Sequence, residues 1–321
     1  MAILIPFWIS VLVRAFGWLI LLRPKGLINE NLIALGVVTE PLAMVAELIE
    51  RLIAAGVHGL ISGGSTGENY AETVEERLEL ARFITERVAG RLPVIVGTGA
   101  MRTPDSIALA QGAREMGADA ILLGTPPYSV PTEQENALNA LAIDRACGLP
   151  IILYNYPGRM SVEMGTEFLD RVGRSRNVIG IKESSGDINR VHLLARDYPH
   201  IQLSCGMDDQ ALEFFAWGAR SWICAGSNFL PEEHVALYEA CAVQGDFTKG
   251  RRIMSAMLPL MRVLEQGGKF IQCVKHGVEV SGITAGPMRP PLKGLNKDEK
   301  RALEQVIRTL KTTVAAITEG N

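Results

Sequence analysis

The chain has 321 residues, of which 48% are hydrophobic and 21% charged, and its formal net charge is −3. That length suits one large domain or two modest ones, and the apolar content is too high for a disordered chain. The slightly acidic balance offers no basic surface for nucleic acid. The five cysteines and five histidines lie far apart, without the spacing of a zinc site. We therefore expect no metal site. We expect the cysteines to be reduced and buried, and reduced thiols point to the cytoplasm.

The first 22 residues differ in composition from the rest of the chain. Residues 2–22 are apolar apart from Ser10 and Arg14, and their length approaches the ~20 residues that span a bilayer. A charge at the centre of a span costs about 2.5–3.5 kcal/mol on insertion scales. The stretch also lacks the basic start and the cleavage site of a signal peptide. An apolar leader that packs on the domain or stays disordered is therefore favoured over a membrane anchor.

From about residue 45 the chain alternates between short apolar runs and amphipathic segments. The apolar runs predict seven strands buried on both faces, within residues 57–64, 92–99, 118–128, 149–157, 177–187, 201–206 and 221–227. The strand in 118–128 is expected to run into a turn, and the strand in 177–187 to be followed by a loop. Apolar spacings of three and four residues predict helices over 45–56, 73–90, 103–116, 133–147, 165–172, 188–197 and 208–217. Such strand–helix units predict parallel strands with right-handed crossovers, in a closed (β/α)8 barrel or an open sheet.

A barrel needs one more strand, and the candidate is LIALGVV at 32–38, within an atypical N-terminal segment, residues 1–44. The stretch PFWISVLVRAFGWLILLRPKGLINENLIALGVVTEPL in this segment resembles a part of polyamine-type ABC-transporter permeases. After about residue 230 only helices are expected, over 231–243, 246–264, 268–278 and 297–318. The predicted organisation is an α/β barrel over residues 45–230 with an atypical first strand, followed by a C-terminal helical domain over 231–321.

Active sites of (β/α)8 barrels lie at the C-terminal ends of the strands, so polar residues there are the candidates. Lys182 is the strongest candidate among them, because it follows the apolar run VIGI at 178–181 in a strand that is expected to be buried. Burial disfavours an ammonium group, and a neutral amine can attack a carbonyl to form a Schiff base. The alternative is a lysine that extends toward solvent or pairs with Glu183.

Other polar residues follow neighbouring strands. Tyr154 ends the preceding strand, where its phenol could shuttle protons or only cap the core. Ser65 and Thr66 lie in a glycine-flanked turn whose hydroxyl and N–H groups can hold a carboxylate. Arg159 can hold a carboxylate through two hydrogen bonds, or be an ordinary surface arginine. Two nearby acids, Glu68 and Asp187, are expected either to be structural or to support the residues that contact substrate.

Three motifs, GGSTGE at 63–68, YNYPGR at 154–159 and GIKESSGD at 180–187, occur in an order and spacing that resembles the dihydrodipicolinate synthase and N-acetylneuraminate lyase family. Its members are lyases and aldolases that bind pyruvate as a lysine Schiff base on a (β/α)8 barrel with a C-terminal helical domain. The resemblance runs from about residue 45 to the C-terminus. It implies a lyase that joins or cleaves pyruvate, or another 2-oxo acid, and an aldehyde, most closely like dihydrodipicolinate synthase. No cofactor is implied, because the lysine imine itself is the electron sink.

The resemblance also implies catalytic roles for four residues. Lys182 would form the Schiff base, and Tyr154 would donate and accept protons. Ser65 would join this proton relay. Tyr128, in TPPYSVP, matches the relay tyrosine that family tetramers supply to the adjacent subunit. A homo-oligomer, either a dimer or a tetramer, is therefore expected.

Substrate-binding roles are implied for further residues. Thr66, together with Ser65, would bind the pyruvate carboxylate. Arg159 matches the arginine that holds the carboxylate of the second substrate in the synthases, aspartate semialdehyde. Ile223 matches the position whose backbone lies against the pyruvate methyl group.

The chain departs from the synthases at three places. Ser65-Thr66 stands where they usually have two threonines, Met160-Ser161 stands where they usually have Thr-Gly, and the first strand with its Thr-Pro-Phe-like end is missing. Two alternatives to a synthase follow. One is a family dehydratase, deaminase or aldolase that acts on sugar acids or hydroxyproline-derived acids, and the other is a catalytically impaired or membrane-associated member.

Overall fold

The computed structural model describes residues 41–320. From Leu48 onward the described residues form one compact unit. Helix α3 (Pro41–Ala54) opens the described part, as the pattern over 45–56 predicts. The candidate strand at 32–38 and the apolar segment at 2–22 lie outside the described residues. None of the helices in residues 41–320 combines the length and the hydropathy needed to cross a bilayer.

Seven parallel strands form one sheet in chain order, and they confirm every strand predicted after residue 56. They are β1 (Leu60–Ser62), β2 (Val94–Gly97), β3 (Ala120–Gly124), β4 (Ile151–Asn155), β5 (Val178–Glu183), β6 (Gln202–Cys205) and β7 (Ser221–Trp222). Each strand pairs with the next in parallel register. This sheet and its connecting helices make a TIM-barrel-like α/β fold, as expected.

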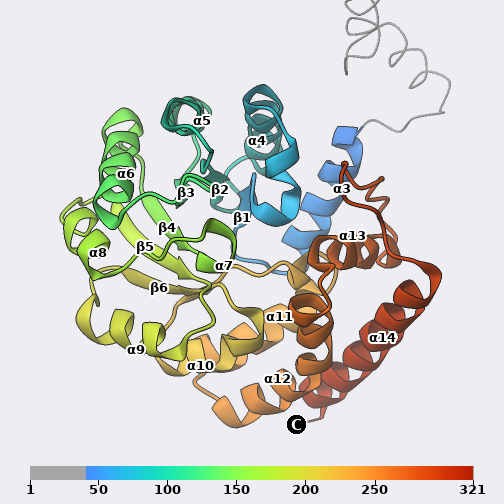
Figure 1. Cartoon of the computed structure of the whole chain (residues 1–321). Helices are drawn as coiled ribbons and strands as arrows, with labels where there is room; N and C mark the ends of the chain where they lie inside the picture. The colour runs from blue at the N-terminus through green and yellow to red at the C-terminus, as the bar shows by residue number, and fades with distance from the viewer. Residues whose placement is uncertain (1–40, 321) are drawn as a thin grey trace, which may run out of the picture. The chain divides into compact units, whose positions relative to one another are not determined.

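The connecting helices surround the sheet, as Figure 1 shows for α4, α5, α6, α8 and α9. Their bounds are α4 (Val74–Val88), α5 (Thr103–Glu115), α6 (Glu133–Cys147), α8 (Thr166–Val172), α9 (Ile188–Asp197) and α10 (Ala211–Ala216). A capping box begins α4: Thr73 Oγ1 accepts from the Glu76 N–H, and a Glu76 carboxylate oxygen accepts from the Thr73 N–H. Helix ends are therefore set by local side-chain chemistry.

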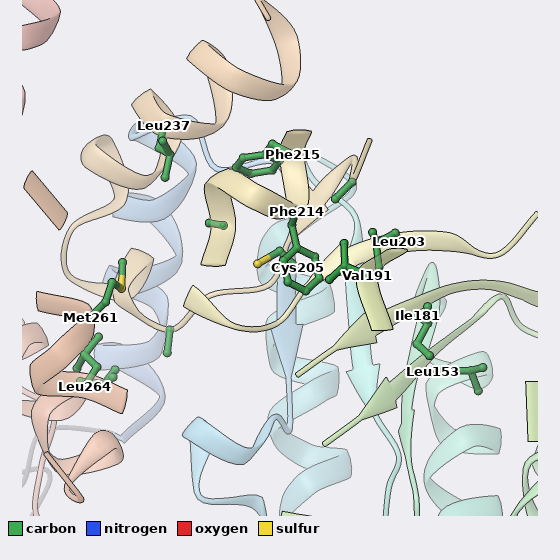
Figure 2. Close-up of a cluster of buried hydrophobic side chains, with 14 of the residues drawn as sticks. Leu153, Ile181, Val191, Leu203, Cys205, Phe214, Phe215, Leu237, Met261 and Leu264 are labelled. Atoms are coloured by element: carbon green, nitrogen blue, oxygen red, sulfur yellow. The ribbon is translucent and has the colours of Figure 1, made fainter. Parts of the chain in front are cut away.

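The hydrophobic core runs from the strands into the C-terminal helices. Leu153 of β4 faces its register partner Ile181 of β5, and Figure 2 shows the two side chains next to each other. The same buried cluster includes Phe214 of α10 and Met261. Since one continuous apolar cluster joins them, the sheet and the C-terminal helices support one another.

The C-terminal part is helical, as predicted, with α11 (Pro231–Tyr238), α12 (Phe247–Met261), α13 (Phe270–Val280) and α14 (Lys297–Glu319). Two of the predicted helices end in π-helical turns, η5 (Glu239–Val243) and η6 (Arg262–Gln266). Pro259 lies in α12 just before η6 and lacks the N–H that a regular helix uses. The boundary at residue 230 stays a prediction.

Candidate active site

Lys182 and Tyr154 lie side by side at the ends of adjacent strands. They are register partners on β5 and β4, and Lys182 Nζ lies 4.5 Å from the centroid of the Tyr154 ring. Tyr154 is buried and Lys182 half-buried. Because side chains alternate along a strand, partners in parallel register share a face. The juxtaposition follows from the strand pattern, and the catalytic roles stay predictions.

Glu183 is the other partner that the sequence offers to Lys182, but its carboxylate is used elsewhere. It accepts two hydrogen bonds from Asn155 Nδ2, at 2.9 and 3.1 Å, and one from the Ser185 N–H at 2.7 Å. Arg190 Nε lies 3.5 Å from it. Glu183 therefore anchors the end of β5, and its neighbour Lys182 points to the opposite face of the strand.

Gly206, directly after β6, lets the backbone pass close to Lys182. A Cβ atom at this position would lie 2.8 Å from Lys182 Cγ and 2.8 Å from the Glu183 carbonyl oxygen, and it would also overlap Ser184 Oγ. The Gly206 N–H donates to the Glu183 carbonyl at 2.9 Å. Sequence reasoning missed this residue, and the only signal for it is a glycine at a strand end.

Asp208 is a buried acid next to the Lys182 strand, and sequence reasoning did not single it out. It lies in η3 (Asp208–Gln210), is 3% exposed, and accepts a hydrogen bond from Trp222 Nε1 at 2.8 Å. Burial raises the pKa of Asp208 to about 6, although the Trp222 hydrogen bond and the charge of Lys182 lower it. The signal in the sequence is a pair of aspartates that begins two residues after a strand-end glycine.

The raised pKa of Asp208 predicts a stability that depends on pH. Since the folded-state pKa is about 6, up from 3.8, the folded protein binds more protons than the unfolded chain between these pH values. The free energy of unfolding should then fall as pH rises from 4 to 6, by about 2 kcal/mol. Replacing Asp208 by Asn should remove this slope in denaturant titrations across that range.

The matched control for this experiment is Asp298→Asn, because Asp298 is an exposed acid in the first turn of α14. Other buried acids titrate in both proteins, so the quantity to compare is the difference between variant and wild type. An identical slope in wild type and Asp208→Asn would contradict the prediction.

Glu265 brings the C-terminal helices into the electrostatics of the site. It lies in η6, far from the strands in sequence. Burial raises the pKa of Glu265 to about 7; Asp208 and Asp209 add to the rise, and Lys182 and Arg159 oppose it. The charges of these groups therefore influence one another, and no sequence motif indicates this proximity.

Ser65 and Thr66 form η1 (Ser65–Gly67), the turn that follows β1. Asn69 Nδ2 donates to the Gly63 carbonyl at 2.8 Å and closes this turn. The β1 end lies three strands away from β4, at the same carboxyl edge of the sheet. The turn is therefore on the edge that carries Lys182.

Arg159 and Ile223 lie on separate elements at this edge. Arg159 is in the short helix α7 (Pro157–Met160), with its Cζ atom 5.4 Å from the centroid of the Tyr156 ring. The Ile223 N–H donates to the Cys205 carbonyl at 2.9 Å, which continues the β6–β7 ladder by one residue. Ile223 thus lies at the strand end, and its role against the pyruvate methyl group stays a prediction.

Tyr128 does not join this cluster within its own chain. Its side chain is 87% exposed, and its φ of 70° lies in the left-handed region. Val130, two residues later, has a φ of 46°, which is unfavourable for a β-branched residue.

In residues 41–320, no three histidine, cysteine or acidic side chains gather as they would around a metal ion.

Comparisons with known proteins give a consistent result. A model described as the dihydrodipicolinate synthetase family matches residues 40–310. The 4-hydroxy-tetrahydrodipicolinate synthase of Pseudomonas putida (strain W619) is 36% identical, over 81% of this chain and 90% of that protein. The enzyme of the same name from Thioalkalivibrio sulfidiphilus (strain HL-EbGR7) is 37% identical, over 79% and 86%.

Solved structures agree with these matches. The 4-hydroxy-tetrahydrodipicolinate synthase of Methylacidiphilum fumariolicum SolV has a TM-score of 0.82 and 28% identity, over 87% of this chain and 93% of that one. YagE from E. coli K12, a prophage protein of the dihydrodipicolinic acid synthase family solved with pyruvate, has a TM-score of 0.79 and 29% identity, over 84% and 92%. The permease resemblance of residues 1–44 finds no support in these comparisons.

Proposed function

Because the chain belongs to the dihydrodipicolinate synthetase family, we propose that it is a Schiff-base lyase that condenses pyruvate with aspartate semialdehyde. The observation that carries this proposal is the pair of Lys182 and Tyr154, with Nζ 4.5 Å from the ring centroid. Relatives named as synthases favour this reaction over those on sugar acids or hydroxyproline-derived acids. They also favour it over a catalytically impaired or membrane-associated protein.

The first step is formation of an imine. The Lys182 amine attacks C2 of pyruvate, and the resulting carbinolamine loses water to leave a C=N bond. Tyr154, packed against the lysine, donates a proton to the departing hydroxyl group and takes one from the nitrogen. Ser65, in the turn after β1, belongs to the same proton relay.

The second step forms the carbon–carbon bond. The protonated imine draws electrons from C3, which loses a proton and becomes the nucleophilic carbon of an enamine. This carbon attacks the aldehyde carbon, and the aldehyde oxygen takes up a proton as the imine re-forms. Attack on that imine by water, or by the amine of the semialdehyde, then frees Lys182. The imine supplies the electron sink, so these steps use no cofactor.

Two carboxylates orient the substrates in this scheme. The Ser65–Thr66 turn holds the carboxylate of pyruvate with hydroxyl and backbone N–H groups, and the backbone at Ile223 lies against the methyl group. Arg159 holds the carboxylate of the aldehyde through its planar guanidinium. Holding both reactants converts a bimolecular encounter into an oriented one.

Borohydride reduction in the presence of pyruvate tests the proposed function directly. Hydride adds to the imine carbon and leaves a stable secondary amine, which peptide mass spectrometry locates. We expect a reduced pyruvyl adduct on Lys182 in the wild-type protein. The absence of any adduct in a folded sample would exclude the proposed chemistry.

Replacing Arg159 by Ala separates the two substrates. Loss of a charge-assisted contact to the aldehyde carboxylate should raise KM for aspartate semialdehyde about 10- to 100-fold, while the pyruvate imine still forms. Steady-state kinetics with each substrate varied in turn provides the measurement. The control is Arg171→Ala on α8, which removes an exposed ion pair with Glu167. An unchanged KM for aspartate semialdehyde in Arg159→Ala would contradict the role of Arg159 in binding the aldehyde carboxylate.

The exposed Tyr128 loop supports a homo-oligomer, either a dimer or a tetramer. Two strained residues, Tyr128 and Val130, present large exposed side chains on this loop. Backbone strain of this kind persists where the surroundings determine it, and a second copy of the chain would supply those surroundings. Tyr128 would then complete the proton relay of the neighbouring subunit. Sedimentation of the full chain should give a dimer or tetramer, and a monomer would contradict this.

The cysteines support a reducing compartment. All five are free thiols, and burial raises the pKa of Cys224 to about 12 and that of Cys241 to about 11. Thiols held neutral in this way are poor nucleophiles. We place the protein in the cytoplasm on this ground. Its small-molecule partner in the proposed reaction is pyruvate.

A further inference from the structure

Glu68 closes the turn that carries Ser65 and Thr66, in a conformation that costs energy. Its φ of 61° and ψ of 28° lie in the left-handed region, between η1 and η2 (Asn69–Ala71). A glycine would adopt this conformation without strain. Glu68 is nevertheless only 7% exposed, so its side chain must make contacts that offset both the strain and the burial of a carboxylate.

Those contacts reach a segment more than 200 residues away in the sequence. Lys275 Nζ donates to Glu68 Oε2 at 2.7 Å, and the Arg289 N–H donates to Glu68 Oε1 at 2.9 Å. Lys275 Nζ also donates to the Pro287 carbonyl at 2.7 Å. We call these four residues, Glu68, Lys275, Pro287 and Arg289, the Glu68 network.

The Arg289 side chain extends the network along the same turn. It donates to the Ala71 carbonyl at 2.9 Å and to both carboxylate oxygens of Glu76 at 3.1 Å. Helix α13, which carries Lys275, packs against η1 and lies beside this region in Figure 1. The Ser65–Thr66 turn is therefore followed by a segment that is held by charged contacts with α13 and with the loop between α13 and α14.

The Glu68 network also determines the charge near the turn. Glu68 lies only two residues after Thr66, so an unpaired carboxylate there would repel an anion held by the turn. Lys275 neutralises it at 2.7 Å. Because both side chains are mostly buried, water screens this interaction weakly.

We propose that Glu68 is a positioning residue, which with Lys275 and Arg289 holds the Ser65–Thr66 turn in the geometry that binds the carboxylate of the 2-oxo acid. This inference rests on the proposed function, since it takes that turn to be the carboxylate site. It assigns to the C-terminal helices a part in binding the first substrate. It also assigns to Lys275 the task of keeping Glu68 from repelling that substrate.

The test is the pyruvate concentration at which half of the protein is trapped by borohydride. Glu68→Gln removes the charge pair and should raise this concentration about tenfold, while the trapped fraction at saturation stays the same. Lys275→Met leaves an unpaired buried carboxylate and should raise it further. The double variant should return to the value of Glu68→Gln, because the repelling charge is gone.

Lys269→Met is the matched control. Lys269 precedes α13 and pairs with Glu299 of α14 at 2.6 Å. The variant therefore removes one lysine charge near the same helix without changing a contact of the turn. Its half-trapping concentration should equal that of the wild type. An unchanged value in Glu68→Gln, or a double variant worse than Lys275→Met, would overturn the proposal.

Amide hydrogen exchange without substrate separates this inference from the proposed function. Glu68→Gln and Lys275→Met should raise exchange several-fold in residues 63–72 and leave α14 unchanged. If wild-type protein forms no imine, the proposed function fails, and unchanged exchange in residues 63–72 refutes the positioning role independently. The two variants act from different elements, so a folding defect in one leaves the other as the test.

Discussion

Replacing Lys182 by Met should abolish the borohydride-trapped pyruvate adduct and lower turnover by at least on the order of 10⁴-fold. Methionine has a similar length and fits the half-buried position next to the Tyr154 ring, but it has no nucleophilic nitrogen. Without the imine there is no electron sink for the C3 carbanion, so no later step can compensate. The measurement combines peptide mass spectrometry of the trapped protein with a coupled assay of turnover.

Lys311→Met on α14 serves as the control for this experiment, because its side chain is exposed. It should keep both the adduct and the turnover of the wild type. Circular dichroism should show that the Lys182 variant is folded. An adduct on a different lysine, or turnover within tenfold of the wild type, would refute the role of Lys182.

Replacing Gly206 by Ala should impair catalysis without removing any reacting group. The added methyl would overlap Ser184 Oγ and lie 2.8 Å from Lys182 Cγ and from the Glu183 carbonyl oxygen, so β6 or these neighbours, the lysine among them, must move. Overpacking of this kind costs about 1–3 kcal/mol of unfolding free energy. A displacement of about 1 Å in the lysine amine should lower turnover by about 10²-fold.

Gly294→Ala is the matched control, because a Cβ atom there would meet nothing within 4 Å. Urea titration of each variant gives the loss of stability, and turnover at a temperature where both are folded gives the catalytic effect. If Gly206→Ala retains wild-type turnover while it remains folded, the close approach to Lys182 does not position the amine.

Much of the fold follows from local sequence. The seven apolar runs predict the seven strands, because a parallel strand buried on both faces needs continuous apolar residues. The capping box of Thr73 and Glu76 marks the start of α4. A spacing of three residues lets each side chain accept a hydrogen bond from the backbone N–H of the other, and these N–H groups have no partner within the helix. The pairing of Lys182 with Tyr154 also follows, because both end adjacent strands.

Some sequence patterns were less informative about boundaries. The prediction of a strand that runs into a turn within 118–128 is confirmed, with the strand at Ala120–Gly124 and Tyr128 in the loop that follows. The helix predicted over 246–264, by contrast, ends at Met261 and continues as η6. There apolar character persists beyond the regular helix, so hydrophobicity alone does not show where the hydrogen-bond pattern changes.

The sequence by itself determined the order of strands and helices, the family, and the residues at the strand ends, because each of these depends on patterns within a few tens of residues. Tertiary structure alone decided which charges are buried and which partners they meet. Asp208 acquires its raised pKa from burial, Gly206 matters because Lys182 passes beside it, and Glu68 meets Lys275 across 207 residues. Burial and ion pairing depend on distance in space, and chain folding brings together groups whose separation in sequence carries no signal.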